Sequence, residues 1–136
     1  MKSTYFFLLA MALAAISCNQ QKGTQEASKE APPTLENRVF KIDNYVNDKK
    51  ESSEDLIFKN NMVEGSDCGQ WGFVASAYTA ENMPDGSIKF SSVMLSPNEG
   101  KMVWEGMVKD KAIEGKMVWS KEGQDDIDYV FRGMEK

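Results

Sequence analysis

The sequence predicts an all-β fold, a small antiparallel up-and-down (meander) barrel of about seven or eight strands. From Asp55 onward apolar and polar residues alternate, which is typical of half-buried strands. The links between the alternating runs are short and rich in turn-forming residues. Neighbouring strands must therefore run antiparallel, because a parallel connection needs a dozen or more residues. A twisted meander can bury its apolar face and remove its exposed edges by closing into a barrel.

The predicted strands follow one another along the chain, and no helical period interrupts the series. Turn formers such as Asn60-Asn61 and Asp110-Lys111 separate them, so each strand is expected to pair with the next. The strands span residues 55–59, 62–66, 72–80, 87–95, 101–109, 112–120 and 126–134.

Residues 38–54 allow two interpretations. Val39, Ile42, Tyr45 and Val46 fit a helical stripe about as well as they fit a first strand. We favour a strand over 38–46, followed by a charged loop over 47–54. The alternative is a helix that plugs one end of the barrel.

One face of each later strand is more apolar and is predicted to line the barrel interior. The opposite face carries a looser apolar strip of Val103, Met107, Val118 and Val130, which could contact a partner, although scattered exposed apolar residues are normal. The inner face comprises Ile88, Phe90, Met94, Met102, Trp104, Val108, Ile113, Met117, Trp119, Ile127, Tyr129 and Phe131.

The pentapeptide Gly-Lys-Met-Val-Trp occurs twice, at 100–104 and 115–119. Two copies so close together are too few for a solenoid. A turn centred on Asp110-Lys111 instead makes them the two arms of one hairpin. The register brings methionine against tryptophan, a contact favourable by about 0.3–1.5 kcal/mol. The inner-face pairs are Trp104–Met117, Met102–Trp119 and Gly106–Gly115.

The glycine pair leaves a gap on the inner face beside Trp104. One interpretation is a notch that admits an apolar or aromatic ligand, and the other is a bend in the sheet where glycine relieves crowding. An eight-stranded barrel is only just wide enough to be filled by its own side chains or to hold one small ligand. The residues predicted to surround such a ligand are Met102, Trp104, Gly106, Gly115, Met117, Trp119 and Tyr129.

The stretch "GSDCGQWGF", residues 65–73, joins two strands and places Cys68 and Trp71 near one rim of the barrel. The chain has one other cysteine, Cys18. If Cys18 is modified, Cys68 has no disulfide partner within the chain. It could be a reactive thiol, form a disulfide with another chain or belong to a loop that caps a ligand. The alternative that we favour is a small buried residue under Trp71.

The inventory of reactive side chains is poor. The chain has no histidine, the usual base for a thiol nucleophile. One available thiol and scattered carboxylates make no ordinary zinc site, and Asp125, Asp126 and Asp128 lack the spacing of a calcium loop. We therefore expect no metal, no cofactor and no enzymatic activity. With 21 acidic against 16 basic residues, the chain also lacks the basic surface that nucleic-acid binding requires.

Residues 1–37 are predicted to precede the barrel domain, which spans 38–136. A basic start and an apolar run from Tyr5 to Ile16, too short to span a bilayer, are typical of a secretory signal. The following "AAISCNQ" resembles the lipobox of bacterial lipoproteins. That resemblance implies a signal peptide over 1–17 and lipidation of Cys18. The rest of the segment 18–37 is polar, which predicts a disordered tether.

The lipobox resemblance also implies a place in the cell envelope. Lipid on Cys18 would hold the protein on a membrane without a spanning segment, because more than one acyl chain anchors stably. In such lipoproteins the lack of aspartate after the cysteine, here Asn19, favours the outer membrane over the inner one. The body would then lie in the periplasm or at the cell surface.

The body resembles the lipocalin-like group in its predicted meander. The stretches "LIFKNNMVEGSDCGQWGF" and "SPNEGKMVWEG" also resemble small secreted bacterial proteins of unknown function, over most of residues 55–133. We expect a membrane-anchored envelope lipoprotein whose barrel binds a small hydrophobic or aromatic ligand. The alternative is a non-catalytic protein-interaction or envelope-structural module with a filled barrel core.

Overall fold

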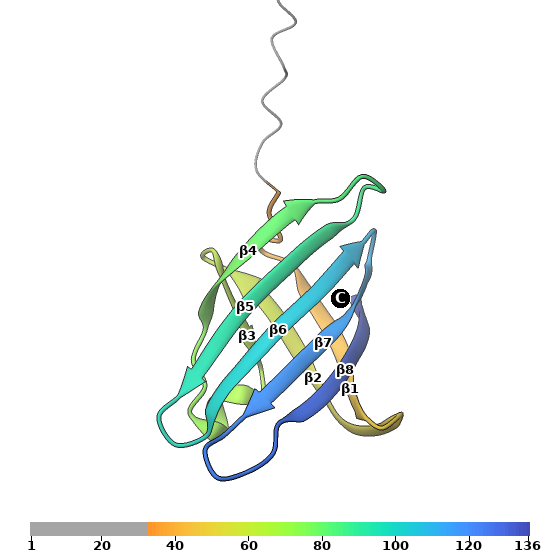
Figure 1. Ribbon diagram of the computed structural model, residues 1–136. Coiled ribbons are helices and arrows are strands. Elements are labelled where there is room, and N and C mark those ends of the chain that lie inside the picture. Colours follow the sequence, from red (N-terminus) through yellow and green to blue (C-terminus); the bar gives the residue numbers. More distant parts are fainter. Residues whose placement is uncertain (1–32) are drawn as a thin grey trace, which may run out of the picture. The chain divides into compact units, whose positions relative to one another are not determined.

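Residues 33–136, which the computed structural model describes, form a closed barrel of eight antiparallel strands (Figure 1). The strands are β1 (Val39–Val46), β2 (Lys49–Lys59), β3 (Met62–Gly65), β4 (Ser76–Asn82), β5 (Ile88–Ser96), β6 (Gly100–Lys109), β7 (Ala112–Ser120) and β8 (Ile127–Glu135), with one short 3-10 helix, η1 (Cys68–Trp71). Each strand pairs with its neighbour in the chain, and β1 also pairs with β8 to close the sheet. The predicted up-and-down barrel is confirmed.

The first hairpin differs from the sequence prediction. Residues 39–46 form a strand, as we favoured, but the charged loop predicted over 47–54 is wrong beyond its first two residues. Asn47 and Asp48 make the turn, both with positive φ (49° and 63°), a conformation that Asn and Asp tolerate. Residues 49–54 belong to β2 and pair with β1. Their apolar alternation is missing because Ser52 and Glu54 face a polar part of the interior.

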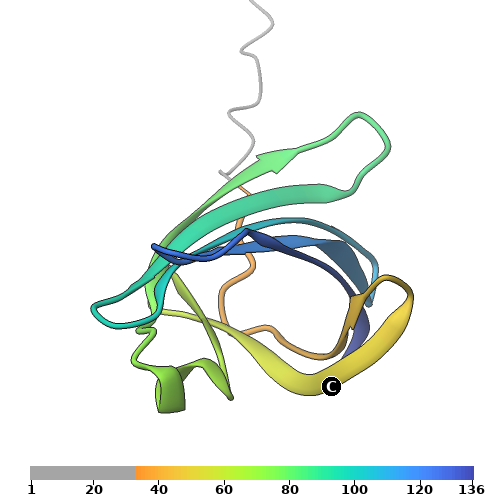
Figure 2. The ribbon, with the colours of Figure 1, turned by 60° about the horizontal axis from the view of Figure 1, so that its bottom comes forward.

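The strand predicted over 72–80 begins later than expected, because η1 and a short loop precede it. Gly72 ends η1 with a φ of 79°, in the left-handed region that glycine enters without a steric cost. Phe73 then packs into the core, and the strand β4 runs from Ser76 to Asn82. The link between β3 and β4 is therefore longer than the sequence indicated, and it lies at one edge of the barrel end that Figure 2 brings forward.

The hairpin of the doubled pentapeptide has the predicted register. Its turn residue Asp110 has a positive φ of 53°. Since one residue of slippage would exchange the two faces of a strand, this register decides which residues line the interior. The pairs are Trp104↔Met117, Met102↔Trp119 and Gly106↔Gly115, as expected.

Aromatic rings fill the middle of the barrel. The rings of Phe58 and Phe90 meet edge to face with centroids 5.1 Å apart, and Trp104 lies 5.2 Å from Phe131. The same rings occupy the gap beside the glycine pair. A Cβ atom on Gly106 would lie 2.6 Å from Phe90 Cε1, and one on Gly115 would lie 2.6 Å from Phe131 Cζ. The gap, for which a ligand notch was one of two interpretations, is therefore filled by Phe90 and Phe131.

The barrel end opposite η1 is closed by the segment that leads into β1. Leu35 is fully buried there, and its backbone N–H donates to the Tyr78 hydroxyl at 3.1 Å. The Glu36 carboxylate accepts the backbone N–H groups of Asn60 and Asn61 at 2.6 and 3.0 Å. The folded body thus includes residues 34–37, which the sequence had assigned to the end of the tether.

The glycine pair generates a stability prediction. A Cβ atom on Gly115 would also lie 2.2 Å from the Glu105 carbonyl oxygen, so Gly115→Ala cannot be accommodated without moving the backbone. We expect it to lower the free energy of unfolding by about 3 kcal/mol, as overpacking does. Gly69→Ala is the control, because no atom lies within 4 Å of its added Cβ, and it should change stability by less than about 0.5 kcal/mol. Urea unfolding measures both, and equal stabilities would contradict the packing described here.

Candidate functional site

A cavity of about 440 Å³ lies at the end of the barrel where η1 and its flanking residues contribute to the lining. Its size is within the range of small-molecule sites. Side chains from five strands, from the segment around η1 and from the β5–β6 loop meet here. Its lining comprises Asn44, Ser52, Glu54, Asp67, Cys68, Gln70, Trp71, Phe73, Glu99, Met102, Met117, Trp119 and Tyr129.

The hairpin of β6 and β7 builds the apolar wall of the cavity. Pairing places Met102 beside Trp119, and Met117 pairs with Tyr129 of β8. The indole N–H of Trp119 donates to the Glu99 carbonyl oxygen at 2.6 Å, which fixes the ring at the rim. At this level the inward side chains are methionines and rim aromatics, whereas phenylalanines face inward in the middle of the barrel. Among the described residues, the middle of the interior is therefore packed and the cavity lies near its end.

The opposite wall is polar and comes from β1 and β2. Glu54 is only 5% exposed, and its Oε1 accepts an N–H from Asn44 Nδ2 at 2.8 Å. The same amide nitrogen donates to Ser52 Oγ at 3.1 Å. Burial raises the pKa of the Glu54 carboxyl, against the opposing effect of its hydrogen bonds to Asn44, to the Asp67 backbone and to Cys68. The amide oxygen of Asn44 has no donor among residues 33–136.

Cys68 is a buried thiol beside this carboxylate. Its Sγ lies 3.6 Å from Glu54 Oε2, and Gly65 leaves the room for both groups. Burial, followed by the nearby charge of Glu54, raises the pKa of the Cys68 thiol to about 12. Because the thiolate is the reactive form, this environment is the opposite of the electropositive one that activates a cysteine. The buried position agrees with the alternative that we favoured for Cys68.

The cavity brings together most, but not all, of the residues predicted to bind a ligand. Trp104 is fully buried in the packed core and lies outside the cavity lining, as do Gly106 and Gly115. The indole N–H of Trp104 has no acceptor among the described residues. Cys18, the predicted lipidation site, lies outside the described residues. The predicted residues that do line the cavity are Cys68, Trp71, Met102, Met117, Trp119 and Tyr129.

Sequence reasoning missed the polar wall. Asn44 has the same strand parity as Phe40 and Ile42, so alternation alone would have placed it inside. Glu54 has the parity of Leu56 and Phe58 in the same way. The signal was present, but the run of charges before Leu56 concealed that residues 49–54 continue a strand.

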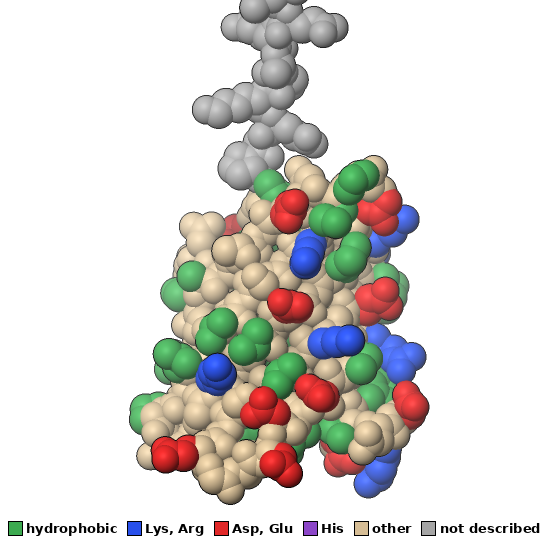
Figure 3. Space-filling model, in the orientation of Figure 1, with side chains coloured by type: hydrophobic (Ala, Val, Ile, Leu, Met, Phe, Trp, Pro, Cys, Tyr) green, Lys and Arg blue, Asp and Glu red, His purple; other side chains and the backbone are tan. Residues whose placement is uncertain are grey.

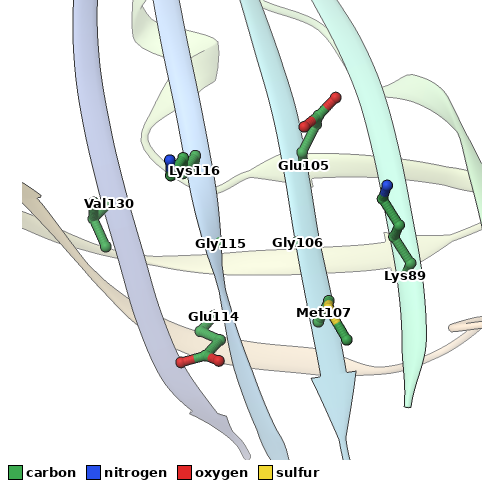
Figure 4. A pocket seen from close by; sticks show the side chains of 8 residues that line it. All are labelled: Lys89, Glu105, Gly106, Met107, Glu114, Gly115, Lys116 and Val130. Atoms are coloured by element: carbon green, nitrogen blue, oxygen red, sulfur yellow. The ribbon is translucent and has the colours of Figure 1, made fainter. Parts of the chain in front are cut away.

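The outer surface offers a second, shallower feature over the glycine pair. A depression of about 430 Å³ surrounds Gly106 and Gly115, and Figure 4 shows apolar and charged side chains of both signs around it. Of the predicted outer strip, Met107 is 37% exposed and Val130 is 45% exposed, whereas Val103 and Val118 are partly buried. Acidic and basic side chains are interspersed on this face of the molecule (Figure 3). No single charge dominates it.

Two further observations concern the described residues. Within 33–136, no group of three or more Cys, Asp or Glu side chains is arranged to hold a metal ion. None of the helices in this part of the chain has the length and apolar character needed to cross a membrane.

Comparison with known proteins gives no relative: no family model, no curated protein and no solved structure matches the chain significantly. The cavity is therefore the feature from which a function can be inferred.

The environment of Cys68 predicts its reactivity. A rise in pKa from 9.0 to about 12 lowers the thiolate fraction at neutral pH about 1000-fold. Alkylation of Cys68 by iodoacetamide should therefore be slower by about this factor in the folded protein than in the urea-unfolded chain. Mass spectrometry of the separated peptides distinguishes Cys68 from Cys18. Similar rates in the two states would show that the thiol is accessible and ionised.

Proposed function

We propose that this protein is a non-catalytic binding protein whose barrel holds one small apolar or aromatic molecule at its η1 end. The observation that carries the proposal is the cavity of about 440 Å³ in a barrel whose middle is filled by aromatic rings. Its apolar side chains come from Phe73, Met102 and Met117, with Trp119 and Tyr129 at the rim. Apolar walls with a few fixed polar groups are characteristic of small-molecule sites.

The chemistry of the cavity supports binding rather than catalysis. Its thiol is held protonated, and the chain has no histidine that could act as a base toward it. The buried carboxyl of Glu54 contacts Asn44 and Cys68, neither of which is an activated nucleophile. These groups can orient a ligand by hydrogen bonding.

We also propose that the protein is anchored to the cell envelope through lipid on Cys18, most favourably at the outer membrane. The support is the apolar run followed by "AAISC" in the sequence. Each buried methylene group contributes roughly 0.8 kcal/mol to membrane binding, so two or more acyl chains suffice to retain the protein. A tethered barrel would hold its ligand at the membrane surface.

Ligand binding can be tested with the neutral fluorescent probe N-phenyl-1-naphthylamine and the full chain carrying Cys18→Ala, which cannot be lipidated at that residue. We expect one probe per protein, with increased probe fluorescence. Ser52→Phe places a ring in the cavity and should weaken binding at least tenfold. Ser53→Phe makes the same change on the outer face of β2, where Ser53 contacts Asp43, and should leave binding unchanged. Absence of probe binding would instead favour the alternative function, a non-catalytic protein-interaction or envelope-structural module.

The anchor is tested by detergent partitioning of the protein expressed with its own N-terminus. The parent chain should enter the detergent phase and incorporate labelled palmitate, and Cys18→Ala should do neither. Cys68→Ala is the matched control, because Cys68 is buried and should not affect lipidation. A Cys18→Ala protein that still partitions into detergent would disprove the anchor.

A further inference from the structure

We infer that the ligand of the cavity is an organic cation, an amine whose ammonium group is held by Glu54 and Asn44 and whose apolar body lies against the methionines and aromatic rings. This inference rests on the proposed function, because it specifies the ligand class for the same cavity. Three independent features of the lining carry it: its charge, an unpaired buried acceptor and its aromatic rim.

The charged side chains that line the cavity are all acidic. They are Glu54, Asp67 and Glu99, and no lysine or arginine of the described part of the chain lines it. Glu99 already pairs with Lys121 at 2.9 Å. Neither Glu54 nor Asp67 forms an ion pair with any lysine or arginine of residues 33–136. An anionic ligand would meet like charges here, whereas a cation would supply the missing counter-charge.

The amide oxygen of Asn44 is a buried acceptor without a donor. Asn44 is 2% exposed, and the orientation of its amide follows from its neighbours. Its nitrogen donates to the Glu54 carboxylate and to Ser52, so the oxygen is the atom left free. An unsatisfied buried polar group costs about 1–3 kcal/mol. A ligand that brings an N–H donor to this point removes that cost.

An ammonium group suits this pair of acceptors. It carries three donors and no acceptor, so it can satisfy Asn44 Oδ1 and a carboxylate oxygen of Glu54 at once. In the empty cavity burial disfavours the ionised form of Glu54 and raises its pKa. A neighbouring cation favours that ionised form. Hydrogen bonds to a charged group are also the stronger kind.

The rim provides aromatic faces for the rest of an organic cation. Trp71, Trp119 and Tyr129 all line the cavity. Trp71 is 57% exposed at the entrance. Aromatic faces attract cations, and tryptophan does so most strongly. Met102 and Met117 offer adaptable apolar contacts to the body of the ligand.

The test uses three probes with one body and different charges: 4-phenylbutylamine, 4-phenylbutanol and 4-phenylbutyrate. Binding to the full chain with Cys18→Ala is measured by calorimetry at pH 7. We expect the amine to bind at least tenfold more tightly than the alcohol, and the acid to bind most weakly. Glu54→Gln should weaken amine binding at least tenfold and leave alcohol binding within about threefold. Glu64→Gln, an exposed acid on the outer face of β3, is the control and should change neither.

The Glu54→Gln variant should fold. Because the folded-state pKa of Glu54 is raised above 4.5, its protonated form stabilises the protein below pH 4.5, and that stabilisation is lost as the pH rises through the raised pKa. Glutamine is neutral at every pH. The unliganded variant should therefore unfold at or above the parent's temperature at pH 7, which thermal unfolding measures.

The outcomes separate the two proposals. Equal binding of amine and alcohol by the parent chain, or an amine preference that survives Glu54→Gln, overturns the cation inference. Failure of the amine to bind overturns it as well. In each case the N-phenyl-1-naphthylamine experiment decides by itself whether the cavity binds small molecules. Only a preference for the amine that depends on Glu54 supports the inference.

Discussion

The structure depends on the way that two phenylalanine rings pack against two glycines. Gly106 and Gly115 stand opposite each other on β6 and β7, and Phe90 and Phe131 occupy the space that their missing side chains leave. An eight-stranded barrel has little interior volume to distribute, so rings at its middle leave no central chamber. Leu35 closes one end. The remaining free volume lies at the other end, where smaller, flexible and polar side chains face inward.

That arrangement divides the barrel into a packed part that stabilises it and a part that contains the cavity. The aromatic middle and the β1–β8 pairing supply burial and closure, and Arg38 of the entering segment forms a two-pronged ion pair with Glu135 at the end of β8. The cavity end carries two unfavourable features, the buried Glu54 carboxyl and the Asn44 amide oxygen without a donor, whereas the unsatisfied indole N–H of Trp104 lies in the packed middle. Departures from ideal packing concentrate at functional sites in proteins, so the two that share this cavity are an indication of function.

Alternation and turn chemistry were sufficient to predict the barrel, its strand order and the register of its central hairpin. The errors came where those signals were absent. Residues 49–54 are polar on both faces, so their place in β2 is set by pairing with β1 and was not visible in the pattern. The late start of β4 follows from Gly72, whose conformation ends η1, and from Phe73, which turns into the core. The apolar wall of the cavity was predictable, because apolar residues are usually buried. Strand parity also places Asn44 and Glu54 inside, but neither was assigned to the interior, because polar side chains are usually outside.

The doubled pentapeptide shows that two identical sequence segments can have different structural roles. Antiparallel pairing sets the tryptophan of each copy opposite a methionine of the other, so the two indoles cannot lie at one level. Trp119 pairs with Met102, two residues from Trp104 along β6 and therefore about 7 Å nearer the rim. Trp104 becomes part of the packed middle, and Trp119 becomes a wall of the cavity with its N–H bound to Glu99. The hairpin thus joins the filled part of the barrel to the part that contains the cavity, and its register determines which tryptophan lines that cavity.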